Sequence, residues 1–174
     1  LIEESLRHAV QAEDFSSAVT IVENHRYELL NTGQWNRLER WFKILPKEFI
    51  DKSPVLLVAK AFLLEYKGQI GEMIAYADQA KKLLNTFSED YPYFNAVQGE
   101  ISVLEGEVQI FSGEGNEAVV SSNKAIGLLP EKAHHAWSYA IGEQVLAHQM
   151  AGDIDKGFKI IRQLMNDHNL PNAL

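Results

Sequence analysis

The chain has 174 residues, and its 16 Lys and Arg against 24 Asp and Glu give a formal net charge of −8. This acidic balance argues against a nucleic-acid-binding surface, because phosphate contacts need clustered cations. The absence of cysteine excludes disulfides, thiolate metal sites and a cysteine nucleophile. The length and the 46% apolar content fit a single domain, residues 1–174, with a substantial core.

Nothing in the chain predicts a membrane or export segment. The longest apolar candidate, residues 55–64, is interrupted by Lys60, and the start carries no signal-peptide pattern. We therefore expect a cytoplasmic protein without membrane contact. Because the chain begins at Leu1, already inside a helical pattern, we also expect it to be a fragment of a larger multidomain protein.

Apolar residues recur at helical spacing along most of the chain, and no segment shows the two-residue alternation of a strand. After Asp153, for example, Ile154, Phe158, Ile161 and Met165 recur at steps of four and three residues, which predicts an apolar stripe on a helix. Turn residues and prolines separate about nine predicted helices, at residues 2–12, 15–31, 34–45, 54–67, 69–86, 92–112, 115–129, 131–151 and 153–168.

Two helix starts carry capping signals. Ser53 followed by Pro54 is typical of an N-cap and a first helical residue, and Asp153 is a second expected N-cap. Short loops between long helices favour antiparallel neighbours.

The turns at Gly68, Gly113 and Gly152 align as an internal repeat, since each is followed by a polar residue and flanked by small residues at helix-crossing positions. Their spacings, 45 and 39 residues, exceed the 34 residues of a standard tetratricopeptide repeat. We predict an all-α fold, a right-handed superhelix of antiparallel helix pairs built from lengthened tetratricopeptide-like repeats. An irregular helical bundle is the alternative.

The first third of the chain carries a more specific pattern. Residues 8–18 form H-A-x-x-A-x-D-x-x-x-A, and residues 38–46 form L-x-x-W-x-x-x-L-P after a turn at Gly33 and before Pro54. In their order and spacing these elements resemble the helical-repeat region of MalT-like regulators, the large ATP-dependent transcription activators of the LuxR type. The resemblance extends from about Leu1 to Met165.

The resemblance implies a bacterial sensor segment that receives an inducer or a regulatory protein and controls self-association of its parent. In that family an ATPase module precedes the repeats and a helix-turn-helix follows them. This chain has neither a G-x-x-x-x-G-K-[ST] loop nor a basic recognition helix near its C-terminus. The resemblance therefore implies that both modules lie outside this chain and that this segment makes no direct nucleic-acid contact.

The residues themselves favour no enzyme, cofactor or metal site. His134 and His135 are adjacent and point in different directions on a helix, and no zinc spacing is present. Asp153, Asp155 and Gly157 begin like a calcium loop, but the glycine comes one position early and a helical stripe follows at once. No serine lies in a G-x-S-x-G setting. A helical-repeat enzyme fragment would need a clustered acid/base set that the sequence does not indicate.

Three aromatic residues, Trp35, Trp41 and Phe42, share roughly one face of the third predicted helix, and we expect them to pack in the core rather than to form a docking site.

The inner face of the predicted superhelix is the candidate binding site, because the first helix of each tetratricopeptide pair lines the groove. This geometry assigns eight residues to the groove: Phe62, Glu65, Tyr66, Glu100, Val103, Glu107, Tyr139 and Gln149. Such a mixture suits a small polar ligand such as a sugar, or a basic helix or extended peptide. For the glutamates, a simple solvated face is the alternative. Whether the segment Asn169 to Leu174 fills the groove stays open.

Two functions remain open at this point. The first is a non-catalytic sensor domain that binds a small-molecule effector or a regulatory protein and controls self-association of a MalT-like regulator. The second is a tetratricopeptide scaffold that holds a partner peptide and has no role in transcription.

Overall fold

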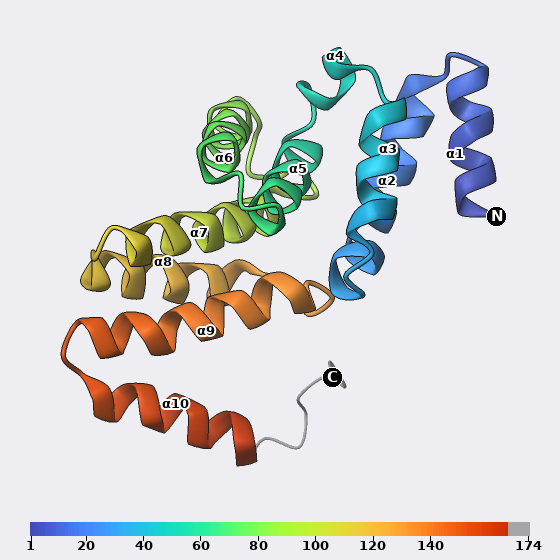
Figure 1. Ribbon diagram of the computed structural model, residues 1–174. Coiled ribbons are helices and arrows are strands. Elements are labelled where there is room, and N and C mark those ends of the chain that lie inside the picture. Colours follow the sequence, from blue (N-terminus) through green and yellow to red (C-terminus); the bar gives the residue numbers. More distant parts are fainter. Residues whose placement is uncertain (167–174) are drawn as a thin grey trace. The chain divides into compact units, whose positions relative to one another are not determined.

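The computed structural model describes residues 1–166, which form ten helices and no strands (Figure 1). The helices are α1 (Ile2–Gln11), α2 (Phe15–Asn31), α3 (Trp35–Ile44), α4 (Lys47–Ile50), α5 (Pro54–Tyr66), α6 (Ile70–Leu84), α7 (Phe94–Phe111), α8 (Gly115–Leu128), α9 (His134–Met150) and α10 (Ile154–Asn166). The all-α prediction is confirmed for this part of the chain. The predicted end of the last helix at residue 168 and the segment Asn169 to Leu174 lie outside the described residues.

Internal contacts divide the chain into two compact units, Leu1–Val97 and a second unit that begins at Gln98. Helices α1 to α6 belong to the first unit and α8 to α10 to the second, while α7 begins in the first and continues into the second. The single domain and the superhelix expected from the sequence stay predictions.

The core of the first unit is built around α5. Nearly every residue from Pro54 to Leu64 is apolar and buried, which is typical of a helix enclosed by its neighbours. Helices α2, α3 and α6 pack against it. The predicted helix start is confirmed, since the Ser53 hydroxyl oxygen accepts a hydrogen bond from the Leu56 amide at 3.1 Å and Pro54 is the first helical residue.

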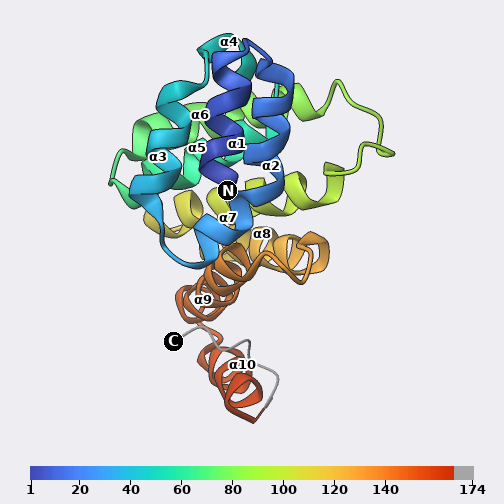
Figure 2. The same ribbon diagram turned by 90° about the vertical axis from the view of Figure 1, so that its right-hand side faces the viewer.

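The aromatic residues of α3 follow the prediction in part. Trp41 and Phe42 are buried in the core, with exposed fractions of 2% and 4%, whereas Trp35 is half-buried. Residues 85–93 connect α6 to α7 and form a loop that projects away from the helices (Figure 2). That connection returns to the unit through Tyr93, whose hydroxyl group is 3.0 Å from the side-chain oxygen of Asn24.

In the second unit, α9 packs against α8 on one side and α10 on the other. A short turn through Gly152, with φ of +82°, reverses the chain, so α10 runs back alongside α9 (Figure 1). The predicted N-cap of α10 is confirmed, because the Asp153 carboxylate accepts a hydrogen bond from the Lys156 amide at 3.4 Å. Near the start of α10, Gly157 allows a close approach of the two backbones, since a Cβ added there would lie 3.3 Å from the Val145 carbonyl oxygen.

The structure corrects the predicted helices at three places. The segment 46–54, predicted as a connection, contains the one-turn helix α4, which begins after Pro46 and is too short to show an apolar period. Helix α7 begins at Phe94 rather than 92. Helix α9 begins at His134 rather than 131, because the Ala133 amide donates to the Pro130 carbonyl and closes a turn first.

None of the helices within residues 1–166 is both long and apolar enough to cross a membrane.

Candidate functional site

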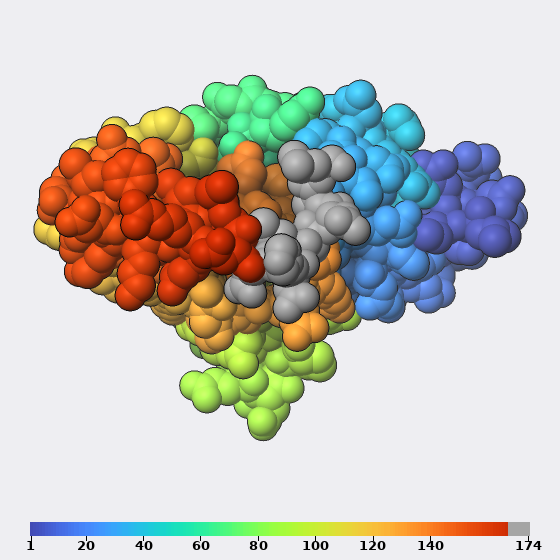
Figure 3. Space-filling model, turned by 90° about the horizontal axis from the view of Figure 1, so that it is seen from below, coloured from blue at the N-terminus to red at the C-terminus, as the bar shows by residue number. Residues whose placement is uncertain are grey.

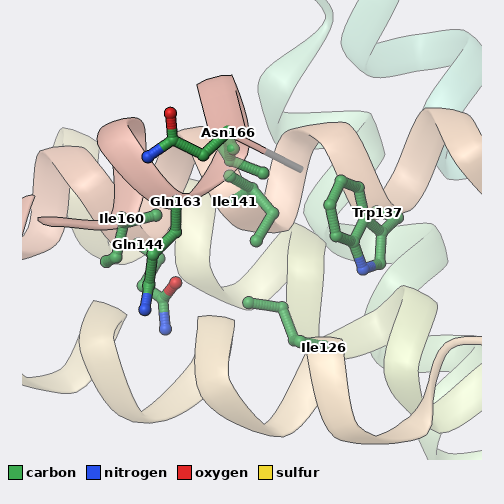
Figure 4. Close-up of a pocket in the computed structure, with 8 residues that line it drawn as sticks. Ile126, Trp137, Ile141, Gln144, Ile160, Gln163 and Asn166 are labelled. Carbon is green, nitrogen blue, oxygen red and sulfur yellow. The ribbon is translucent and has the colours of Figure 1, made fainter. Parts of the chain in front are cut away.

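A hollow of the second unit lies where α8, α9 and α10 meet (Figure 4). Its volume is about 520 Å³, which is within the range of small-molecule sites. Eight residues line it: Ile126 of α8; Trp137, Ile141 and Gln144 of α9; and Ile160, Gln163, Leu164 and Asn166 of α10. We call this hollow the α8–α10 cavity.

Helical spacing places the lining residues on facing stripes. Trp137, Ile141 and Gln144 are four and three residues apart, so they share one face of α9. On α10, Ile160 and Leu164 are four residues apart and face the same space. The cavity wall is therefore made by these stripes of α9 and α10 together with Ile126 of α8.

The lining combines apolar side chains with neutral amides and contains no charged group. Figure 4 shows Trp137 and Gln144 on opposite sides of the cavity. The Gln144 amide nitrogen donates a hydrogen bond of 2.6 Å to the side-chain oxygen of Asn123, which holds the Gln144 side chain in place. Such a lining suits an uncharged ligand that offers an apolar face to the indole and hydrogen-bonding groups to the amides.

The three groove residues predicted in the first unit have different surroundings. Phe62 is fully buried, with an exposed fraction of 0%, and Glu65 is half-buried. Tyr66 is 57% exposed, and its ring stacks on Trp35 with centroids 4.6 Å apart and planes 12° apart. Of the three groove residues predicted in this unit, Tyr66 is thus the one whose aromatic ring is accessible to a ligand.

The five groove residues predicted in the second unit also differ in exposure. Glu100 and Val103 are buried, with exposed fractions of 1% and 0%, while Glu107 is half-buried. Tyr139 is half-buried beside His135, with ring centroids 4.7 Å apart, and Gln149 is exposed. None of the five lines the α8–α10 cavity, and a groove shared by all eight predicted residues stays a prediction.

Sequence reasoning missed the α8–α10 cavity. Trp137, Ile141 and Gln144 do form a regular stripe within the predicted helix 131–151, so the part of the lining that α9 contributes was visible in the sequence. Residues of α8 and α10 close the cavity. Their contribution depends on how three helices pack, and no local sequence pattern contains that information.

Within the described residues no group of three or more His, Cys, Asp and Glu side chains is arranged to hold a metal ion. On α9, burial lowers the pKa of His135 from 6.5 to about 4.

Because of this pKa shift, we expect the free energy of unfolding to depend on pH. The folded state disfavours the imidazolium form of His135, so the unfolded chain binds more protons between pH 6.5 and 4. The stability that depends on neutral His135 is complete above pH 6.5 and is lost as the pH falls towards 4, by up to about 3 kcal/mol. Denaturant titrations at pH 7.5, 6, 5 and 4.5 measure this loss.

The variant His135→Phe keeps an aromatic ring beside Tyr139 and removes the titrating group. Its free energy of unfolding should fall less steeply between pH 6.5 and 4.5 than that of the unmodified chain. Glu39 does not interfere in this range: hydrogen bonds from Lys67 and Lys43 lower its pKa to about 2, so its contribution is lost only as the pH falls below about 4.5. Equal slopes for the two proteins would contradict the role of His135.

The amino-acid sequence of the chain is similar to those of one group of transcription regulators. It is 25% identical over 160 residues to the HTH-type transcriptional regulator MalT of Cronobacter sakazakii and 21% identical over 160 residues to the MalT of Serratia proteamaculans. The chain is a distant relative of MalT regulators. Both alignments cover 92% of this chain but only 17% and 18% of the regulators, so the chain spans less than a fifth of their length. No family model and no solved structure matches it.

Proposed function

We propose that this chain is a non-catalytic sensor and interaction segment of a MalT-like transcription regulator. The observation that carries the proposal is the similarity to MalT regulators along 92% of the chain. In this proposal the paired helices belong to a tetratricopeptide-like superhelix, and the turn glycines Gly68, Gly113 and Gly152, all with positive φ, mark equivalent positions of its repeats. A cytoplasmic location belongs to the same proposal.

The segment acts by differential binding. An effector, which is a small molecule or a regulatory protein, binds one arrangement of the helices better than another and so shifts the parent towards one state of self-association. No catalytic group is required, and nucleotide hydrolysis and DNA contact are assigned to other parts of the parent. The α8–α10 cavity is the part of the segment best suited to a small uncharged effector, because its lining is apolar with neutral amides.

A thermal-shift screen tests this function with two sets of probes, uncharged sugars and basic peptides. A ligand at about 100 times its dissociation constant stabilises the fold by about 2.7 kcal/mol, which raises the melting temperature by about 5–10 °C for a chain of this length. A shift with an uncharged small molecule supports the sensor proposal. A shift with peptides alone favours the scaffold function, in which the segment holds a partner and has no role in transcription.

Variants then locate the binding site. In the α8–α10 cavity, Trp137→Phe and Gln144→Leu should weaken ligand binding at least about tenfold, because each removes a contact of defined geometry. The matched control is Gln11→Leu, which changes an exposed amide on α1 and should bind normally. Tyr66→Ala and Glu107→Ala test the groove that the sequence predicts. Binding that survives all four changes would contradict both candidate sites.

A further inference from the structure

Lys60 is a charged residue in the middle of the apolar helix α5. Its neighbours in the chain, Ala59 and Ala61, are buried, and Lys60 itself is half-buried. Its ammonium group lies 5.3 Å from the centre of the Phe42 ring on α3, and that ring is also buried. Among the residues that the structure describes, no carboxylate forms an ion pair with Lys60. Lys60 is thus a partly desolvated cation whose charge is not offset by an ion pair.

Two further lysines lie near Lys60, and both pair with the same carboxylate. Glu39 of α3 contacts Lys43 of the same helix at 3.0 Å and Lys67, at the end of α5, at 2.7 Å. Helices α3 and α5 pack on each other, and Figure 3 shows the surfaces of α3 in light blue and of the end of α5 in green next to each other at the top of the view. The three lysines therefore belong to one surface region of the first unit.

These surroundings lower the pKa of Lys60. Burial of the ammonium group is the largest cause, the positive charge of Lys67 is the next, and Lys43 adds a smaller effect in the same direction. The carboxylates of Glu39 and of Glu72 on α6 act in the opposite direction without cancelling the shift. A lower pKa leaves more of the amine neutral at a given pH, and the neutral amine is the nucleophilic form of lysine.

We propose that Lys60 is a covalent modification site, at which an acyl phosphate transfers its acyl group to the side-chain amine. The lone pair of the neutral Nζ attacks the carbonyl carbon of the donor, so that a C–N bond forms. The bond between that carbon and the phosphate oxygen breaks, and the phosphate leaves with the electron pair. The surplus proton of the amine passes to the departing phosphate, so the products are an Nε-acyl-lysine and inorganic phosphate.

Two features favour a small anionic donor. The Lys60 nitrogen forms no hydrogen bond within residues 1–166 and is not enclosed by protein, so a small molecule reaches it although the side chain is half-buried. The charges of Lys43 and Lys67 act on the same place and attract a phosphate group. Acylation leaves a neutral side chain, which removes the cost of keeping an ammonium group half-buried. This modification is independent of the proposed sensor function.

Site-resolved acetylation of the 174-residue chain tests the proposal. The chain is incubated with acetyl phosphate at about pH 8, and peptide mass spectrometry measures the initial rate of acetylation at each lysine. The matched comparator is Lys52, which is exposed and whose ammonium group also lies over a ring, 5.8 Å from the centre of Phe49. We expect Lys60 to react at least about threefold faster than Lys52 and the exposed Lys124. An equal or slower rate at Lys60 would overturn the proposal.

Two further measurements connect the rate at Lys60 to its folded surroundings. In about 6 M urea the preference for Lys60 over Lys52 should disappear, because burial and the neighbouring charges are lost. Lys67→Gln removes the cation with the largest effect on Lys60 and should slow its acetylation about twofold, whereas Lys82→Gln, an exposed change on α6, should leave it unchanged. Circular dichroism checks that both variants fold. A preference that persists in urea, or a rate at Lys60 that Lys67→Gln leaves unchanged, would refute the assignment.

Discussion

Replacing Phe62 by alanine lowers the free energy of unfolding by about 3–5 kcal/mol, the cost of removing a large, fully buried aromatic side chain. Phe62 lies on α5, whose surface is covered by α2, α3 and α6, so the void left by the ring has little chance to collapse. Urea unfolding followed by circular dichroism measures the effect.

The matched control is Tyr66→Ala, one turn further along α5. Tyr66 is 57% exposed and loses mainly its stack on Trp35, so we expect a loss of only about 0.5–1.5 kcal/mol. Similar losses for the two variants would contradict the core position of Phe62. A large loss of unfolding free energy in Phe62→Ala would indicate that Phe62 has a structural role. The sequence had instead made it a candidate for direct ligand binding.

Replacing Gly115 by valine at the start of α8 should be the second large effect, a loss of about 3 kcal/mol or more. A Cβ at this position would lie 2.9 Å from the Met150 Cβ, 3.1 Å from the Ala151 amide nitrogen and 3.2 Å from the Ala147 carbonyl oxygen. Two of these three atoms belong to the backbone of the end of α9, so the crossing of α8 and α9 has to open to admit the side chain.

Gly142 on α9 provides the control for this prediction. It is exposed, and a Cβ added there meets nothing within 4 Å, so Gly142→Ala should raise the stability by about 0.5–1 kcal/mol through helix propensity. Thermal and urea unfolding of both variants measure the difference. If Gly115→Val is as stable as the unmodified chain, the close crossing of α8 and α9 is wrong.

The two variants also bear on the α8–α10 cavity, because α9 carries Trp137 and Gln144. A change at Gly115 that opens the α8–α9 crossing should weaken ligand binding together with stability, whereas Gly142→Ala should leave binding unchanged. Binding measured on folded protein well below the melting temperature separates the two effects.

Local signals in the sequence determined the helices, because a 3.6-residue apolar period and a cap depend only on near neighbours in the chain. The N-caps Ser53 and Asp153 and the burial of Trp41 and Phe42 follow from such signals. Helix α4 escaped prediction because one turn is too short to display a period.

Only the tertiary structure decided which apolar stripes are covered. The stripe from Ile154 to Met165 has the same local pattern as a core stripe, yet it is exposed, while the side through Gly157 packs on α9. The α8–α10 cavity likewise needs side chains from three helices, and Trp137 by itself predicts neither a core nor a binding position. Burial and cavity shape depend on which helices become neighbours, a property of long-range packing that a helical period cannot contain.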